Sequence, residues 1–254
     1  MHIAPEEEAI RILDASSSGR VVLKLLGGVA IAIRCPSASQ DGLRREYLDL
    51  DFVGHAKQSG AISKLFREMG YQPRQRFNAM MGGKRLIFND LVNQRRVDIF
   101  LDLFEMCHRF DFRQRVELEP RTLPLADLLA TKLQIVQINE KDFRDVTSLL
   151  LDHEIGSGDG EAINGRYIAR LCASDWGMYR TFSMNLSKLR LALQSFALPP
   201  VDSELVNSRI ETLLRMIEEE PKSLGWKLRA RVGERLPWYE LPEADSAVVV
   251  DSMD

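Results

Sequence analysis

Two short stretches in which acidic and apolar residues alternate constrain the fold more than any other feature of this chain. They are Tyr47–Val53 and Arg96–Asp102, and each is typical of a strand with carboxylates on one face and apolar side chains on the other. Residues two apart on a strand point the same way, roughly 6.6 Å apart, so Asp49 and Asp51 stand side by side. If the second strand lies next to the first, Asp98 completes a cluster of three carboxylates.

Such a cluster has a chemical consequence. Three carboxylates held close together repel one another unless cations neutralise them. Carboxylate oxygens are hard ligands that suit Mg²⁺ or Mn²⁺, and a pair of such ions roughly 4 Å apart is the usual device for phosphoryl and nucleotidyl transfer. The sequence therefore predicts a divalent-metal site at Asp49, Asp51 and Asp98. Asp102, four residues further along the second strand, is the alternative third ligand.

A pair of glycines, Gly27 and Gly28, follows a predicted strand at Val21–Leu26 and precedes a predicted helix that begins near Val29. Glycine lets the backbone approach a ligand closely, and a helix N-terminus offers free N–H groups to a phosphate. Many tight strand-to-helix turns also carry glycine, so this pair alone is a weak indication of a phosphate site.

The segment between the two acidic stretches is strongly basic, although the whole chain has a net charge of −3. Between residues 57 and 96, nine lysines and arginines stand against two acidic residues. One interpretation is an ordinary solvated surface. Because the segment lies between the two carboxylate strands, the other is a site for a polyanion such as a triphosphate or a nucleic acid.

The rest of the pattern predicts two parts. In the first half we expect helices at 5–16 and 58–69, a hairpin of 74–80 and 84–88, and a further strand at 114–119. After Thr122 the pattern is helical, with predicted helices at 124–138, 140–152, 164–173, 175–195, 203–219 and 222–232. We expect an α+β fold, a mixed sheet with flanking helices, followed by an all-helical domain. The predicted divisions are a catalytic domain at 1–121, a helical domain at 122–236 and a flexible acidic tail at 237–254.

No apolar run reaches the roughly 20 residues that a membrane-spanning helix needs, and the acidic N-terminus is not a secretory signal. Cys35, Cys107 and Cys172 are scattered and lack metal-binding spacing, which predicts buried thiols in a reducing cytoplasmic compartment. The three tryptophans, Trp176, Trp226 and Trp238, are interpreted as anchors of helix packing, with stacking on a base as the alternative.

The order strand, Gly27-Gly28, helix, Asp49-Leu50-Asp51 and then Asp98 resembles the nucleotidyltransferase superfamily with the polymerase-β-type palm. Two later stretches, Leu123–Gln134 and Lys141–Asp145, resemble the abortive-infection toxin branch of that superfamily and its uncharacterised bacterial relatives. Many members carry Ser or Thr after the glycine pair, where this chain has Val29. The resemblance therefore implies that, at this turn, backbone groups alone bind the phosphates.

The resemblance implies a role for each motif. Asp49, Asp51 and Asp98 would be catalytic and would hold Mg²⁺ or Mn²⁺, with Asp98 able to take the proton of the acceptor hydroxyl. Gly27 and Gly28 would cradle the triphosphate of an NTP.

Further along the chain, the resemblance favours a nucleotide-binding role for Lys132, which otherwise snorkels from an apolar helix stripe to solvent. For Asp142 and Asp145 the alternatives are nucleotide binding, orientation of Lys132, or plain stabilisation of a helix N-terminus.

The sequence thus predicts a Mg²⁺-dependent enzyme that moves an NMP group from an NTP to an acceptor hydroxyl. The acceptor is open: an RNA such as tRNA, a protein side chain, or a small polyol. The toxin-like resemblance adds an antitoxin protein as a candidate partner, and no membrane partner is expected. The alternative is a non-catalytic nucleotide-binding or interaction module on the same fold. A metal-dependent phosphohydrolase is disfavoured because its metals usually have histidine ligands, and no histidine lies in the motifs.

Overall fold

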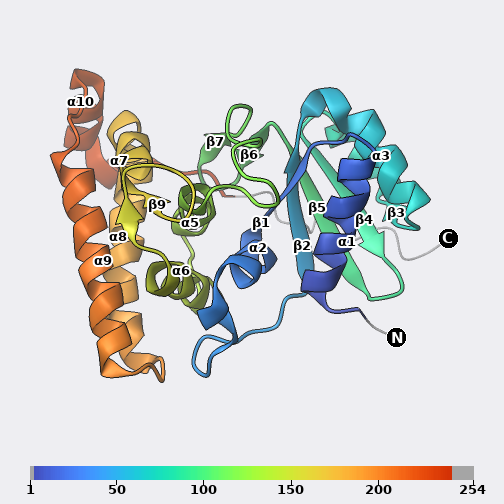
Figure 1. Ribbon diagram of the computed structural model, residues 1–254. Coiled ribbons are helices and arrows are strands. Elements are labelled where there is room, and N and C mark those ends of the chain that lie inside the picture. Colours follow the sequence, from blue (N-terminus) through green and yellow to red (C-terminus); the bar gives the residue numbers. More distant parts are fainter. Residues whose placement is uncertain (1–2, 242–254) are drawn as a thin grey trace.

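Residues 3–241, which the computed structural model describes, contain a five-stranded mixed sheet (Figure 1). Its strand order is β1-β2-β5-β4-β3. The strands are β1 Leu23–Leu26, β2 Asp49–Gly54, β5 Arg95–Leu101, β4 Arg85–Asp90 and β3 Gln72–Pro73. The central pair, β2 and β5, is parallel, and the other neighbouring pairs are antiparallel. The two acidic stretches therefore form adjacent strands, as the sequence predicts.

Helices pack around this sheet. They are α1 Pro5–Ser18, α2 Gly27–Arg34, α3 Ser59–Glu68 and α4 Gln75–Met81. Figure 1 shows α2 between the sheet and the helices of the C-terminal half. Because α2 starts directly at the end of β1, its first turn lies beside the strand that carries Asp49 and Asp51.

The C-terminal half is helical. Its helices are α5 Leu125–Leu133, α6 Glu140–Asp152, α7 Gly165–Ser174, α8 Trp176–Ala192, α9 Pro200–Glu219 and α10 Leu224–Val232. Two small sheets accompany them, β6 Leu103–Glu105 with β7 Arg109–Asp111, and β8 Ile155–Gly156 with β9 Ile163–Asn164. Short 3₁₀ segments lie at Pro36–Ser39, Ala56–Gln58, Leu193–Ser195 and Gly233–Arg235. The predicted fold class, a mixed sheet with flanking helices followed by a helical region, is confirmed.

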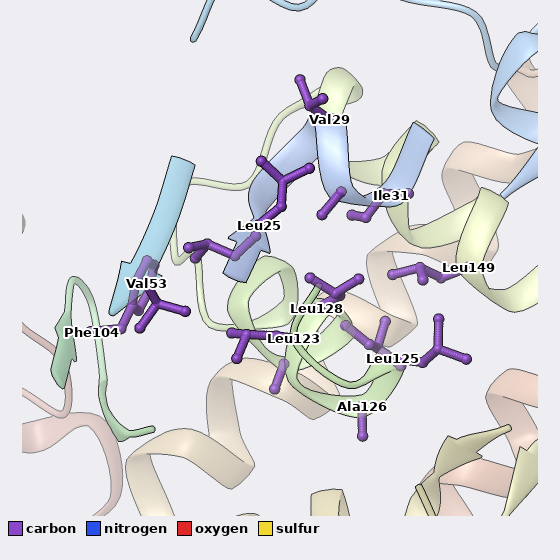
Figure 2. Close-up of a cluster of buried hydrophobic side chains, with 14 of the residues drawn as sticks. Leu25, Val29, Ile31, Val53, Phe104, Leu123, Leu125, Ala126, Leu128 and Leu149 are labelled. Atoms are coloured by element: carbon purple, nitrogen blue, oxygen red, sulfur yellow. The ribbon is translucent and has the colours of Figure 1, made fainter. Parts of the chain in front are cut away.

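One continuous hydrophobic core joins the two halves. Figure 2 shows its central part, where Leu25 of β1 and Ile31 of α2 face Leu128 of α5 and Leu149 of α6. This packing fixes α5, and with it Lys132, relative to the end of β1. The division at residues 121 and 122 stays a prediction, and residues 242–254 of the predicted tail lie outside the described residues.

Two predicted strands are wrong. Residues 75–80 lie in helix α4 instead of a strand, and residues 114–119 form turns and bends. The sequence of α4 has no β-branched residue, which removes the main local preference for a strand. Its Asn78 side chain completes the sheet edge in place of a strand, since Nδ2 donates to the Ile87 carbonyl (3.0 Å) and Oδ1 accepts from the Ile87 N–H (2.8 Å).

Helix α1 is anchored to the sheet region by a buried carboxylate. Glu8 is 1% exposed and accepts hydrogen bonds from Arg11 (2.8 and 2.6 Å) and from the Tyr71 hydroxyl. Burial alone would raise the pKa of Glu8, but these hydrogen bonds outweigh it, so the pKa lies below its usual value.

Within residues 3–241, no helix has the length and apolar character needed to cross a membrane. Cys35, Cys107 and Cys172 are buried free thiols. His108, the neighbour of Cys107, directs its Nε2 to the Thr181 hydroxyl at 2.8 Å.

Candidate active site

The three predicted carboxylates meet on one face of the sheet. Asp51 on β2 and Asp98 on β5 are register partners in the parallel pair, and Asp49 lies two residues before Asp51 on the same face. All three line one cavity of about 260 Å³. Asp49 is exposed, Asp51 is half-buried and Asp98 is 4% exposed, so the cluster runs from solvent into the protein.

Asp51 is the carboxylate that this arrangement perturbs most. Burial and the neighbouring charges of Asp49 and Asp98 raise the pKa of Asp51 to about 8. A carboxyl group in this position is not fully ionised near neutral pH, because its burial and the two neighbouring carboxylates outweigh the attraction of Lys132 and Arg85. A bound cation would reverse that balance.

Asp98 already has cationic partners. Its Oδ1 lies 2.7 Å from Nη2 of Arg85 on β4, and its Oδ2 lies 2.7 Å from Nε of Arg96. The sequence analysis assigned no role to either arginine. The sequence pattern could have indicated Arg96, because it lies two residues before Asp98 and so shares its strand face. Arg85 was one of nine basic residues, and only the antiparallel pairing of β4 with β5 singles it out.

The first glycine of the pair lies directly against one carboxylate of the cluster, and the second faces Arg45 and Tyr47. Gly27 has φ of +73°, and a Cβ atom there would overlap the carboxylate of Asp51. At Gly28 a Cβ atom would overlap the guanidinium of Arg45 and lie 3.0 Å from the Tyr47 ring. Gly27 requires glycine, because its backbone is in the left-handed region and a Cβ atom would overlap Asp51. A side chain at Gly28 would have to displace the Arg45 guanidinium.

Lys132 of α5 reaches the same cavity and is held by two carboxylates of α6. Its Nζ lies 3.0 Å from Asp142 Oδ1 and 2.9 Å from Asp145 Oδ2. Burial would lower the pKa of Lys132, but the two carboxylates outweigh it and the pKa is raised. The side chain is therefore a fixed cation on the wall of the carboxylate cavity.

Two of the three interpretations of the α6 acids match contacts in the structure, a cap of the helix N-terminus and the orientation of Lys132, and nucleotide binding stays a prediction. Asp142 completes a capping box with Asn139 at the start of α6, and it also holds Lys132. Asp145 binds Lys132 and additionally accepts two hydrogen bonds from Arg45, at 2.8 and 2.7 Å. Arg45, which the sequence analysis did not single out, thus links the Gly28 turn to Lys132 through Asp145.

The alternative third ligand, Asp102, lies apart from this cluster. It follows the end of β5 with φ of +61°, and its Oδ1 lies 3.2 Å from Nδ1 of His55. The backbone turn at Asp102 ends the alternation of side chains between the two faces of β5. Asp102 therefore does not share a strand face with Asp98, although the sequence predicted that it would. Asp98 is the residue that the structure brings to Asp49 and Asp51.

Within residues 3–241, no three His, Cys, Asp or Glu side chains form a ready-made metal centre. The donor set nevertheless suits a hard divalent ion at Asp49 and Asp51, because carboxylate oxygens are hard ligands and because burial and the charges of Asp49 and Asp98 raise the pKa of Asp51, a cost that a bound cation would offset. Asp98 would join such an ion only by giving up part of its contact with Arg85 or Arg96.

No family model matches this chain, and no curated protein matches it. Among solved structures, it is similar to the lincosamide antibiotic adenylyltransferase LnuA with lincomycin bound. The two chains are 16% identical, the match covers 57% of this chain and 96% of the other, and the TM-score is 0.43.

Proposed function

We propose that this chain transfers an NMP group from an NTP to an acceptor hydroxyl. The observation that supports this most directly is the register pairing of Asp51 with Asp98, with Asp49 beside them and Gly27 against the Asp51 carboxylate. Carboxylates next to a helix N-terminus and several fixed cations suit a substrate that combines phosphates with a divalent ion.

In this reaction the acceptor oxygen forms a bond to the α-phosphorus, the bond from that phosphorus to the bridging oxygen breaks, and pyrophosphate leaves. The acceptor proton passes to a carboxylate or to water. Asp49 and Asp51, with Asp98, would hold Mg²⁺ or Mn²⁺, which supplies charge neutralisation on the phosphates and lowers the pKa of the acceptor hydroxyl. Positioning and electrostatic stabilisation account for most of the catalysis in phosphoryl transfer.

The remaining residues act on the triphosphate. The N–H groups at the start of α2, from Gly27 and Gly28, would donate to phosphate oxygens, and Lys132, which lines the same cavity as Gly27, would add a positive charge. Asp142 and Asp145 hold Lys132 in place. Arg85 and Arg96 are further candidates for phosphate contacts, because both line the same cavity.

The test is incubation with each labelled NTP, Mg²⁺ or Mn²⁺, and separate acceptor sets: total tRNA, protein, and a panel of small polyols. We expect metal-dependent transfer with release of pyrophosphate. Asp49→Asn and Asp51→Asn should each abolish it while the far-ultraviolet circular dichroism stays unchanged. Asp111→Asn, which removes an exposed carboxylate paired with Arg113, is the matched control and should retain full activity.

Two outcomes would count against the proposal. Unchanged turnover in Asp51→Asn would remove the assigned site. NTP binding without transfer to any acceptor class would favour the alternative, a nucleotide-binding module in which Arg85 and Arg96 permanently occupy Asp98. Transfer to tRNA would instead favour a toxin-like function and an antitoxin protein as partner.

A further inference from the structure

Arg45 lies one contact away from the carboxylate cavity. It belongs to the segment 40–48, between the 3₁₀ segment Pro36–Ser39 and β2. Its Nε and Nη2 donate to Oδ1 and Oδ2 of Asp145 at 2.8 and 2.7 Å, and its Nη1 donates to the Glu46 carbonyl at 3.0 Å. All three guanidinium nitrogens are therefore committed to the protein. Arg45 does not line the carboxylate cavity, so it would not touch a substrate bound there.

Packing fixes the guanidinium as firmly as its hydrogen bonds do. Its Cζ lies 4.2 Å from the centre of the Tyr47 ring, and Tyr47 precedes Asp49 by two residues. Its Nη2 fills the space that a Cβ atom on Gly28 would need. A guanidinium that is both bidentate and stacked has a geometry that an ammonium group does not reproduce. Arg45 thus has one fixed position between the first turn of α2, the start of β2 and helix α6.

Four charged groups form a row that ends at the cavity wall. Lys132 Nζ contacts both Asp142 and Asp145, and Asp145 in turn contacts Arg45. Within residues 3–241, Lys132 and Arg45 are the ion-pair partners of Asp145. One lysine and two carboxylates alone would carry a net charge of −1 beside a cavity that we propose takes a triphosphate. With Arg45 the row is neutral.

The protonation states agree with this charge balance. Burial alone would raise the pKa of Asp145, but the charge of Lys132 and the hydrogen bonds from Arg45 hold it below its usual value. Burial and the charge of Arg45 act to lower the pKa of Lys132, and the two carboxylates outweigh them. Asp145 and Lys132 are therefore both charged at neutral pH, and the balance of the row depends on Arg45.

Stability alone does not account for the pair of Arg45 with Asp145. The two side chains are 12% and 3% exposed, and the desolvation of a buried ion pair offsets much of its attraction. Apolar side chains could pack the segment 40–48 against α6 equally well. An apolar contact could not offset the charge of Asp145 next to Lys132.

Resting on the proposed function, we propose that Arg45 is a positioning residue for the triphosphate and acts through Asp145. By balancing the charge of Asp145, it lets that carboxylate hold Lys132 in place without cancelling the positive charge that Lys132 presents to phosphate oxygens. The same guanidinium supports the first turn of α2 at Gly28, where backbone N–H groups would donate to the phosphates. Arg45 thereby joins two phosphate-binding elements that are distant in the sequence.

The test measures binding without turnover, by isothermal titration calorimetry in Mg²⁺. The probes are inorganic tripolyphosphate and the α,β-methylene analogues of ATP, GTP, CTP and UTP. Arg45→Gln should weaken tripolyphosphate and the nucleotide analogues by the same factor, roughly tenfold, because the loss lies at the phosphates. Arg45→Lys keeps the charge but loses the bidentate geometry, so it should weaken both roughly threefold. In the transfer assay, Arg45→Gln should raise KM for the NTP more than it lowers kcat.

The matched control is Arg44→Gln, which removes the same charge from the neighbouring residue. Arg44 is exposed, and its Nε donates to the Ser39 carbonyl at 3.3 Å. We expect its affinity for both kinds of probe to equal that of the parent. Far-ultraviolet circular dichroism and urea unfolding establish that each variant is folded before binding is measured.

A double-mutant cycle tests whether Arg45 acts through Asp145. In the Asp145→Asn background, Arg45→Gln should change the affinity by less than roughly threefold, because the carboxylate that it balances is gone. If Arg45→Gln does not fold, Arg45→Lys in the same two backgrounds gives the comparison, with a loss in the parent and none in Asp145→Asn.

Three results would overturn the role of Arg45: parental affinity in Arg45→Gln, or in Arg45→Lys where that variant replaces it, an equal loss in Arg44→Gln, or a full loss that persists in the Asp145→Asn background. A parent that binds the probes but transfers nothing would defeat the transferase proposal and leave the role of Arg45 at the phosphates intact. A parent that binds neither tripolyphosphate nor any nucleotide analogue would overturn both.

Discussion

Gly27 and Asp51 are in such close contact that a methyl group on the glycine would overlap the carboxylate. The backbone of the first turn of α2 thus lies against the most perturbed acid of the cluster. The contact joins the two sequence motifs, the glycine pair and the Asp-x-Asp strand, into one site. It also makes the site sensitive to a small substitution, since a Cβ atom on Gly27 would have to displace the Asp51 side chain.

Gly27→Ala should therefore impair transfer more than it impairs folding. The positive φ of +73° costs a non-glycine residue about 1–3 kcal/mol, and displacement of Asp51 should reduce the transfer rate roughly 100-fold. Rates with saturating NTP and urea unfolding curves measure the two effects. Gly83→Ala is the control, because a Cβ atom there meets nothing within 4 Å. An equal loss of transfer rate in Gly27→Ala and Gly83→Ala would refute a specific role for Gly27.

The arginines on Asp98 should set the metal affinity of the free protein. Arg85→Gln removes one positive charge at 2.7 Å from the Asp98 carboxylate, so Mn²⁺ should bind roughly threefold to tenfold more tightly in the absence of nucleotide. Electron paramagnetic resonance of free Mn²⁺ gives the affinity. Arg113→Gln, which removes an exposed arginine from Asp111, should change nothing. An unaltered Mn²⁺ affinity in Arg85→Gln would mean that Asp98 is not part of the metal site.

Acid stability should depend on Glu8. Its folded pKa lies below the usual value because of Arg11 and Tyr71, so its contribution is fully present above the unfolded pKa, about 4.3, and is lost as the pH falls through the folded pKa. Glu8→Gln should be less stable than the parent by about 1–3 kcal/mol at pH 7, and the gap should narrow in acid. Urea unfolding from pH 7 to pH 3 measures this. Glu7→Gln, at an exposed position, should show the same free energy of unfolding as the parent at each pH. A stability difference between Glu8→Gln and the parent that widens in acid would contradict a lowered pKa of Glu8.

The site motifs could be found from the sequence because they rest on local rules. The period of two along a strand placed Asp49 beside Asp51, and a glycine pair after a strand marked the start of α2. The pairing of Asp51 with Asp98 needed one further assumption, that the two acidic strands are neighbours, and the parallel β2–β5 register supplies it. The helices of the C-terminal half followed from their apolar stripes for the same local reason.

What the sequence did not reveal depends on contacts between distant residues. Arg45 lies 100 residues from Asp145, and no local pattern links them. Asp102, the alternative to Asp98, was predicted to share its strand face, but the positive φ at Asp102 turns the chain away from that face. The tryptophans come from three separate segments, so their common cavity emerges only once α8, α10 and residues 237–240 are packed together. In each case tertiary packing, not propensity, decides the outcome.

Helix α4 offers a test of such a tertiary contact. Asn78 satisfies both the N–H and the carbonyl of Ile87, a residue that is fully buried. In Asn78→Ala the Ile87 N–H loses its Asn78 partner, whereas the Ile87 carbonyl keeps the hydrogen bond that it accepts from the Arg74 N–H (3.0 Å). The free energy of unfolding should therefore fall by about 1–3 kcal/mol although alanine is the better helix former. Gln75→Ala, at an exposed position of the same helix, should change stability by less than about 0.5 kcal/mol. Faster amide exchange at Ile87 in Asn78→Ala would locate the loss, whereas a stabilised Asn78→Ala variant would show that helix propensity, and not the bridge to β4, holds α4 in place.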